Sequence, residues 1–532
     1  MNEADTTDRL VLPQWLPSVR ALQSREAGVH KHKEREIDYA RSFEVFNELL
    51  LGFREDPSPY AASDLMGVAV VLNEKDIAKE IAGYVVSDPR VGQVAQSQAR
   101  VILANSPNVF STDDHASIKD SKIRLSSFPR DAFAWIDQAR LYTIIGQYNK
   151  AKRAINAALH LSPADRIIVR SAIRFFAHHD EWDAALYHAE KAYRIKNDPL
   201  ILGLIVSIGT QLKKLPVKLK PIAQTALASS DMFLYSEVLA ALGTFEIING
   251  AEQRSKRFFK RAWADPSKPV VSQSQWVIRN HLPSFTREQS INFYQSAEAM
   301  SWLRFAVLDF KSAVIRANDW ILEEPYSRSA HLHGSHSAVL LDDYVAAEAI
   351  AKRGLQANPG DLTMLNNLAF AQLRRGDATG ASSTFEPLLA GLEERSDIAE
   401  TATFGLLLMS QGNMLDGSAH YQKAINMAIE KGSLNTAVRA SLHYMISTLD
   451  LAKTMDLNVL QQSTKVLSSV TDPGCIGTAM SLAKRLEKIH FEGAELKEAA
   501  QEFWSVVKEA ELRLATSAFG TLVDELTTKC EN

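Results

Sequence analysis

Residues 132–165 read AFAWIDQARLYTIIGQYNKAKRAINAALHLSPAD. Trp135, Ala139 and Tyr142 recur at intervals of four and three residues, which places their side chains on one face of a helix. Gly146 then interrupts the apolar periodicity. The first half of this stretch therefore predicts a short helix that ends at a glycine turn.

The second half of the same stretch predicts another helix. Tyr148, Ala151, Ile155 and Ala158 form its apolar stripe, and Pro163 ends it because proline cannot continue a helix interior. A small residue such as Ala151 allows two helices to approach closely. The unit is therefore predicted to be a hairpin of two packed helices.

The hairpin pattern recurs along the chain with a period of 34 residues, and about seven units are recognisable between residues 132 and 432. A recurring period of this length is typical of helical repeat proteins. Three successive units open their second helix with the same pair of positions: Phe310 and Ala313, Tyr344 and Ala347, and Ala378 and Ala381. Each pair lies 34 residues after the one before it, and Pro325 and Pro359, between units, are also 34 residues apart.

The unit resembles the tetratricopeptide repeat (TPR) family at most of its signature places. These are Trp135, Ala139, Tyr142, Gly146, Tyr148, Ala151, Ala158 and Pro163. The resemblance implies an all-α fold, an α-solenoid that winds as a right-handed superhelix of helical hairpins. It also implies a function in binding a partner in a concave groove, without catalysis.

The strength of the repeat pattern divides the chain into five regions. We expect an N-terminal helical region with a degenerate repeat at 1–120, a first array at 121–267, an irregular connection or hinge at 268–293, a second array at 294–432 and a C-terminal helical cap at 433–532. Atypical terminal regions are expected because the ends of a solenoid face water.

Composition excludes several classes of protein. The chain has 532 residues and a formal net charge of −4, which argues against a globally basic nucleic-acid binder. Its two cysteines, Cys475 and Cys530, cannot form a disulfide scaffold or a four-cysteine zinc site. The N-terminal sequence lacks the basic start and apolar run of a secretory signal, and the longest apolar runs are too short to cross a bilayer. We expect a cytoplasmic protein.

No phosphate-binding glycine loop, nucleophile elbow or metalloprotease motif is present. We therefore expect no catalytic activity and no cofactor. His331, His333 and His336 are the strongest metal-like cluster. They would need ligands from a neighbouring helix, so we predict no metal site and keep a metal-dependent enzyme as the weakest hypothesis.

The TPR resemblance implies that the first helix of each hairpin lines the groove. The residues so assigned are Asp137, Arg140, His333, His336, Asn366, Asn367 and Phe370. Some members of the family hold a C-terminal carboxylate with Lys, Arg and Asn from adjacent first helices. Here Asn367 fits, but Thr403 and His336 stand where a Lys or Arg is expected. This departure argues against a carboxylate clamp.

A basic patch provides the alternative function. Residues 201–270 contain 10 basic and 5 acidic residues, and the patch comprises Lys213, Lys214, Arg254, Lys256, Arg257, Lys260 and Arg261. Such a patch favours an acidic protein or a phosphate backbone, and Phe258 and Phe259 could stack on bases or lie in the core. Our first hypothesis is a scaffold, adaptor or regulatory subunit that binds a protein. The alternative is a nucleic-acid-binding helical-repeat protein.

Overall fold

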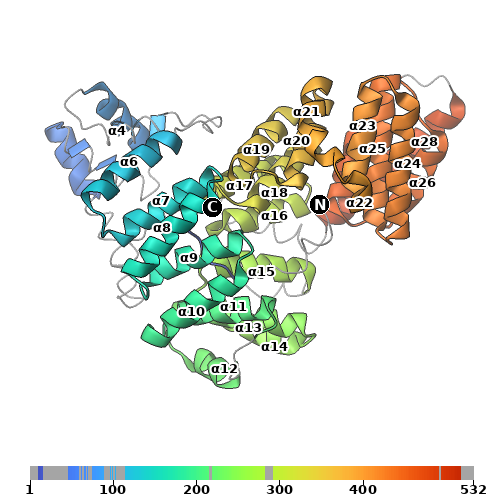
Figure 1. Ribbon diagram of the computed structural model, residues 1–532. Helices are drawn as coiled ribbons and strands as arrows, with labels where there is room; N and C mark the ends of the chain where they lie inside the picture. The colour runs from blue at the N-terminus through green and yellow to red at the C-terminus, as the bar shows by residue number, and fades with distance from the viewer. Residues whose placement is uncertain are drawn as a thin grey trace. The chain divides into compact units, whose positions relative to one another are not determined.

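The computed structural model describes residues 10–15, 46–58, 114–214, 219–281, 291–489 and 493–516, together with parts of 61–103. Within these residues every regular element is a helix, which confirms the prediction of an all-α solenoid (Figure 1). The chain forms two compact units. One comprises Leu16–Leu141, and the other comprises Met1–Trp15 together with Tyr142–Asn532.

The smaller unit has its own apolar core. It contains a helix over 46–55, α4 (Lys75–Ser87), α6 (Asp114–Ser127) and most of α7 (Ala132–Ile144). Phe46, Phe53, Leu65 and Ile81 are buried in one cluster. The ring of Phe53 meets that of Tyr84 edge-on, with centroids 5.1 Å apart.

The larger unit is built from helices that pack against their neighbours in the chain (Figure 1). Its first half contains α8 (Tyr148–Leu161), α9 (Arg166–His178), α10 (Trp182–Lys196), α11 (Pro199–Gln211), α12 (Leu219–Ala228), α13 (Met232–Ile248), α14 (Glu252–Ala262) and α15 (Lys268–Asn280).

The second half begins with a 3-10 turn, η3 (Phe293–Gln295). It continues with α16 (Ala297–Ala306), α17 (Phe310–Glu323), α18 (Arg328–Leu340), α19 (Tyr344–Ala357), α20 (Leu362–Arg374), α21 (Ala378–Leu389), α22 (Leu392–Arg395), α23 (Ile398–Ser410), α24 (Met414–Glu430), α25 (Leu434–Ala452), α26 (Leu457–Leu467), α27 (Pro473–Leu486) and α28 (Ala494–Ala515).

The 34-residue period has a local cause at the start of the second helices. The side chains of Asp309, Asp343 and Asp377 cap α17, α19 and α21 by accepting backbone N–H groups at 3.1, 3.0 and 2.8 Å. Each cap satisfies a donor that the first turn would leave unpaired. Four residues after each aspartate, the small side chains of Ala313, Ala347 and Ala381 are fully buried where helices pack.

The structure corrects one expectation about secondary structure. Residues 268–293, which were predicted to be an irregular connection, contain the regular helix α15, which begins directly after Ser267. Pro269 lies in its first turn, where proline has no hydrogen bond to lose and its fixed φ suits the helix. A proline in this place starts a helix instead of breaking it. Whether the region bends remains a prediction.

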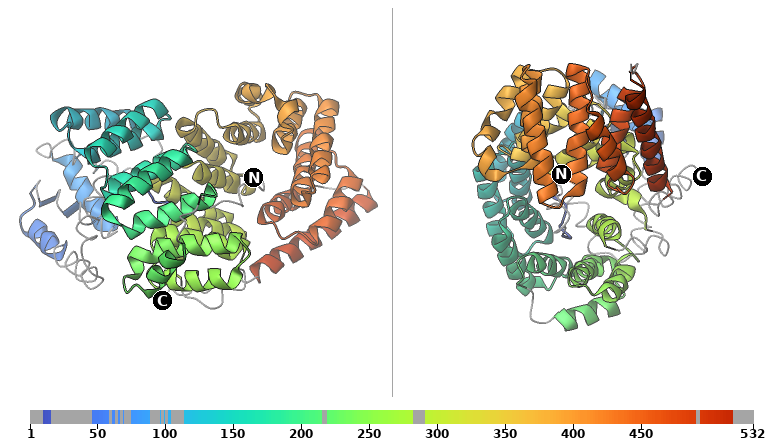
Figure 2. Two further views of the ribbon diagram at one scale, coloured as in Figure 1. Left: turned by 60° about the horizontal axis from the view of Figure 1, so that its bottom comes forward. Right: turned by 90° about the vertical axis from the view of Figure 1, so that its right-hand side faces the viewer.

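Among the described residues after 433, helices α25, α26, α27 and α28 pack side by side at the C-terminal end of the larger unit (Figures 1 and 2). Their apolar faces share one core, which includes Leu442, Leu460, Leu482 and Phe503. Among the residues that the structure describes, none of the helices combines the length and the apolar character needed to cross a bilayer.

Candidate functional site

A pocket of about 130 Å³, called the small pocket below, opens where the first helices of successive hairpins lie side by side. It is formed by α18, α20, α23 and α25, with one residue from α24. The lining residues are His336, Val339, Asn366, Asn367, Phe370, Ile398, Ala399, Ala402, Thr403, Tyr421, Thr436, Arg439, Ala440 and His443.

Four residues that the sequence assigned to the groove come together in this pocket. They are His336 on α18 and Asn366, Asn367 and Phe370 on α20. The Phe370 ring meets the His443 ring edge-on, with centroids 5.1 Å apart. Asn367 donates its Nδ2–H to Ser335 Oγ at 3.4 Å, a long contact that leaves the amide able to bind another group.

Arg439 is a pocket residue that sequence reasoning missed. Its guanidinium lines the small pocket and makes no hydrogen bond or ion pair with any residue that the structure describes. It comes from α25, which lies outside the recognisable repeats. The spacing of Arg439 and His443 by four residues was the available signal, because it places both on one face of a helix.

The histidines of the small pocket are neutral at pH 7. Burial lowers the pKa of His443 to about 3, and the guanidiniums of Arg374 and Arg439 act in the same direction. Burial also lowers the pKa of His336, and Arg439 contributes. Among the residues that line this pocket, Arg439 is consequently the one that carries a charge. Its charge favours an acidic ligand.

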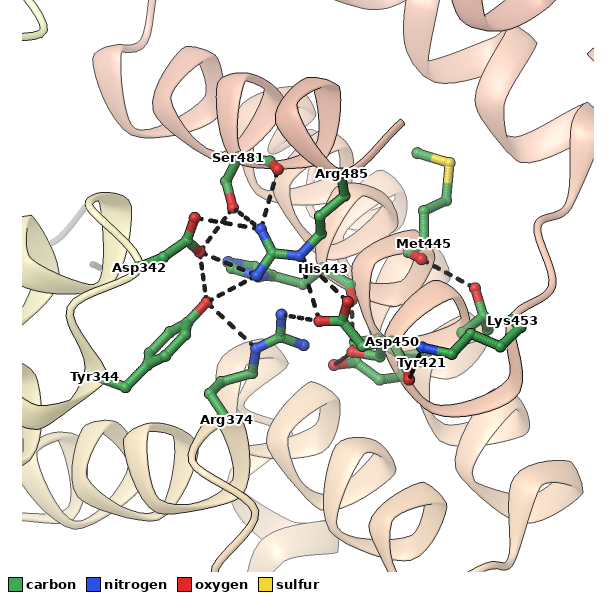
Figure 3. A network of polar contacts seen from close by, with 12 residues as sticks. Asp342, Tyr344, Arg374, Tyr421, His443, Met445, Asp450, Lys453, Ser481 and Arg485 are labelled. Atoms are coloured by element: carbon green, nitrogen blue, oxygen red, sulfur yellow. Dashed lines mark hydrogen bonds and ion pairs between the residues drawn. The ribbon is translucent and has the colours of Figure 1, made fainter. Parts of the chain in front are cut away.

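A polar network holds α25 and α27 against the repeats and so positions Arg439 (Figure 3). Arg485 on α27 donates to both oxygens of Asp342, at 3.2 and 3.1 Å. Arg374 on α20 pairs with Asp450 on α25 at 2.7 Å. Burial alone would raise the pKa of Asp342, but hydrogen bonds from Arg485 and Tyr344 outweigh it and lower the pKa. The charged pairs therefore fix the C-terminal helices to the array.

His333 lies in the wall of a second, larger pocket of about 300 Å³, called the large pocket below. The His333 side chain is 1% exposed, and burial lowers its pKa to about 3. The lining residues are Leu10, Leu12, Gln14, Arg174, Pro269, Ser272, Gln275, Trp276, Arg279, Glu298, Trp302, Trp320, Glu324, Ser327, Ser329, Leu332 and His333. His333 and His336 thus serve different pockets.

The remaining predicted groove residues are Asp137 and Arg140. Both lie on α7, in the part of that helix that belongs to the smaller unit.

The histidines are not gathered into a metal site: within the described ranges, no group of three or more His, Cys, Asp or Glu side chains is placed to hold a metal ion. Cys475 is a buried free thiol, and Cys530 lies outside the described residues.

The basic patch is largely engaged within the protein. Lys214, Arg254 and Lys256 form ion pairs with acidic side chains, at 2.7, 3.0 and 2.6 Å. Arg261 donates to the Ser229 carbonyl at 3.0 Å. Phe259 is 0% exposed, so it belongs to the core and is not a stacking surface.

The two basic runs also lie in different parts of the fold. Lys213 and Lys214 follow α11, whereas Arg254, Lys256, Arg257, Lys260 and Arg261 belong to α14. Helix α13 packs against both α11 and α14 (Figure 1). The patch is therefore two separate runs, one after α11 and one on α14, and both helices pack against α13.

Comparisons with known proteins find only a distant structural likeness. No protein-family model matches the chain, and no curated protein matches it. Solved structures that resemble it include the APC/C hetero-tetramer Cut9–Hcn1, at 12% identity over 91% of this chain and 98% of that chain, with a TM-score of 0.33. Yeast Tom70 is similar at 12% identity over 88% and 99%, with a TM-score of 0.25.

A third similar structure is the human IFIT1 dimer with m7Gppp-AAAA. Its identity is 13% over 72% of this chain and 94% of that chain, with a TM-score of 0.29. At these identities and TM-scores the likeness does not indicate a ligand for this chain.

Proposed function

We propose that this protein is a non-catalytic scaffold or regulatory subunit of the TPR type, which binds a protein partner through the small pocket in the cytoplasm. The observation that carries the proposal is Arg439, which lines a pocket formed largely by first helices and makes no hydrogen bond or ion pair with a described residue. A guanidinium without a partner is suited to a carboxylate, which it can bind with two hydrogen bonds. The preferred partner is therefore a peptide or helix that carries an acidic group.

The rest of the small pocket suits such a peptide. Val339, Phe370 and Ala402 provide apolar surface for a side chain next to the acidic group. Asn367 has an amide that can bind a peptide backbone group. A pocket of about 130 Å³ accepts one or two side chains, since sites for drug-sized ligands begin at roughly 300 Å³.

Affinity purification with the purified full chain as bait tests this proposal. Proteins captured by the wild type should be lost when Arg439→Glu is the bait, because a carboxylate partner would then face a like charge. Arg254→Glu is the matched control, since Arg254 lies on α14 and does not line the pocket. The proposal fails if Arg439→Glu captures the same proteins in the same amounts as the wild type.

The alternative function is nucleic-acid binding by the basic patch. The ion pairs of Lys214, Arg254 and Lys256 reduce the support for it, because a phosphate would have to replace them. Nuclease treatment before the affinity purification separates the two functions. If capture disappears after nuclease treatment, falls steeply with salt and is lost with Lys256→Glu but not with Arg439→Glu, the alternative function is favoured.

A further inference from the structure

The N-terminal segment Leu10–Trp15 lies among helices that follow it by more than 150 residues. It is neither helix nor strand. Leu10, Leu12 and Gln14 line the large pocket. Val11 and Trp15 are each 1% exposed and are covered by helices. The segment therefore sits on the helical array as a bound peptide would.

Two anchors hold the segment. Trp15 packs against Phe175, with ring centroids 6.0 Å apart, and against Tyr326, at 5.5 Å. Val11 belongs to the apolar core cluster that contains Trp276. Burial of apolar surface is thus the main attraction.

Polar contacts add little to this attachment. Gln14 donates its Nε2–H to Glu323 Oε2 at 3.1 Å. The backbone of the segment makes no hydrogen bond with any residue that the structure describes, and the buried Trp15 Nε1–H has no acceptor. The gain from burying a few apolar side chains is of the same order as the entropic cost of ordering six residues. The segment is therefore held weakly enough to be exchanged.

Arg279 in the large pocket has no ion-pair partner among the residues that the structure describes. The guanidinium of Arg279 lines the pocket and lies 4.2 Å from the centroid of the Trp302 ring. It makes no hydrogen bond or ion pair with a described residue. Burial lowers its pKa to about 10, and the attraction of Asp472 offsets only part of this effect.

The described acidic residues around the large pocket do not form an ion pair with Arg279. Glu324 pairs with Arg174 at 3.2 Å, and Glu298 has a partner of its own. Asp472 does not line the pocket. It attracts Arg279 but forms no ion pair with it, and its Oδ1 caps α27 by accepting the N–H of Cys475 at 2.8 Å. The pocket thus has a cation with room beside it and an apolar cradle that already holds an extended peptide.

We infer that the large pocket and the helix surfaces under Leu10–Trp15 form a second peptide-binding site. Its internal ligand is the segment itself. Its external ligand is an extended peptide with the same apolar anchors and an acidic side chain for Arg279. This site does not depend on the small pocket, and Arg439→Glu should leave it unchanged.

Fluorescence anisotropy with labelled hexapeptides tests the inference on the full chain. The probe is LVLPQW, the sequence of residues 10–15. Trp15→Ala should bind the probe at least about tenfold more tightly than the wild type, because the wild-type site is occupied by its own segment. Trp15→Phe should fall between them, and it carries the test if circular dichroism shows that Trp15→Ala does not fold. The inference is wrong if all three chains bind the probe equally.

Two further peptides test the chemistry of the site. LVLPQA lacks the main anchor and should bind Trp15→Ala at least about tenfold more weakly than LVLPQW. LVEPQW places a carboxylate on the side that faces the pocket and should bind more tightly than LVLPQW. That gain should vanish when Arg279→Gln is added to Trp15→Ala. Equal binding of LVEPQW and LVLPQW would overturn the acidic preference, and a wild-type dimer that Trp15→Ala dissociates would overturn the assignment of the segment to its own chain.

Discussion

Arg174 on α9 donates its Nε–H to Glu324 Oε1 at 3.2 Å, and the two residues are 150 positions apart in the chain. Trp320 donates its Nε1–H to the other carboxylate oxygen at 3.1 Å. Burial alone would raise the pKa of Glu324, but Arg174 and these hydrogen bonds lower it. The pair therefore stays ionised in the wall of the large pocket and joins helices from the two halves of the larger unit.

Arg174→Met should destabilise the protein by about 3–5 kcal/mol, because it leaves a buried carboxylate without a partner. Adding Glu324→Gln should recover part of the loss. Urea denaturation at pH 7 measures both effects. Arg194→Met breaks an exposed pair with Glu190 and should cost below about 1 kcal/mol. Equal losses of stability for Arg174→Met and Arg194→Met would show that burial does not increase the cost of breaking the Arg174–Glu324 pair.

The buried histidines predict that stability falls in mild acid. The pKa of His333 is about 3 in the folded protein and about 6.5 in an unfolded chain. Its contribution to stability is therefore fully present above pH 6.5 and is lost as the pH falls from 6.5 towards 3. The expected slope is about 1.4 kcal/mol per pH unit for this residue.

Urea denaturation at pH 7, 6 and 5 measures the free energy of unfolding of His333→Gln. The fall of this free energy per pH unit should be smaller than in the wild type by about the contribution of His333. His160 is exposed, and His160→Gln serves as the control, with a slope that matches the wild type. A His333→Gln slope equal to that of the wild type would show that this side chain is protonated without penalty.

Two turn glycines should respond differently to the same substitution. Gly146 has φ +68°, and a Cβ there would lie 2.7 Å from the Gln356 carbonyl oxygen and 2.8 Å from Pro359 Cδ. Gly376 has φ +84° but nothing within 4 Å of a Cβ. Gly376→Ala should cost only the left-handed backbone strain, about 1 kcal/mol. Gly146→Ala should lower the melting temperature clearly more, because backbone must also move. Equal melting temperatures for the two variants, measured by calorimetry, would contradict the close approach of Gly146 to Gln356 and Pro359.

The repeat packing predicts that small residues between helices cannot be enlarged. Ala347 is fully buried in α19, whereas Val345 on the same helix is exposed. Ala347→Leu should destabilise the protein by about 1–3 kcal/mol through overpacking, while Val345→Leu should change stability little. Thermal unfolding followed by circular dichroism compares the two, and an unchanged melting temperature for Ala347→Leu would show that the repeat register is wrong.

Sequence could predict those residues of the candidate site whose place follows from their position within one hairpin. His336, Asn366, Asn367 and Phe370 were found because their places within a hairpin indicate which face of a first helix they occupy. Arg439 could not be found in this way, since α25 does not carry the repeat signature. Sequence shows the charge of the basic patch, but it does not show that Lys214 and Arg254 pair with acidic side chains of other helices.

By itself the sequence determined the all-α repeat, its period and the start of several second helices, because periodicity and turn glycines act over a few residues. Only the tertiary structure decided which distant parts meet. The pairing of Arg174 with Glu324, the docking of Leu10–Trp15 and the presence of Arg439 in the same pocket as Asn367 all depend on how many hairpins stack and on their angles. Those quantities accumulate small packing differences over hundreds of residues, and no local pattern in the sequence encodes them.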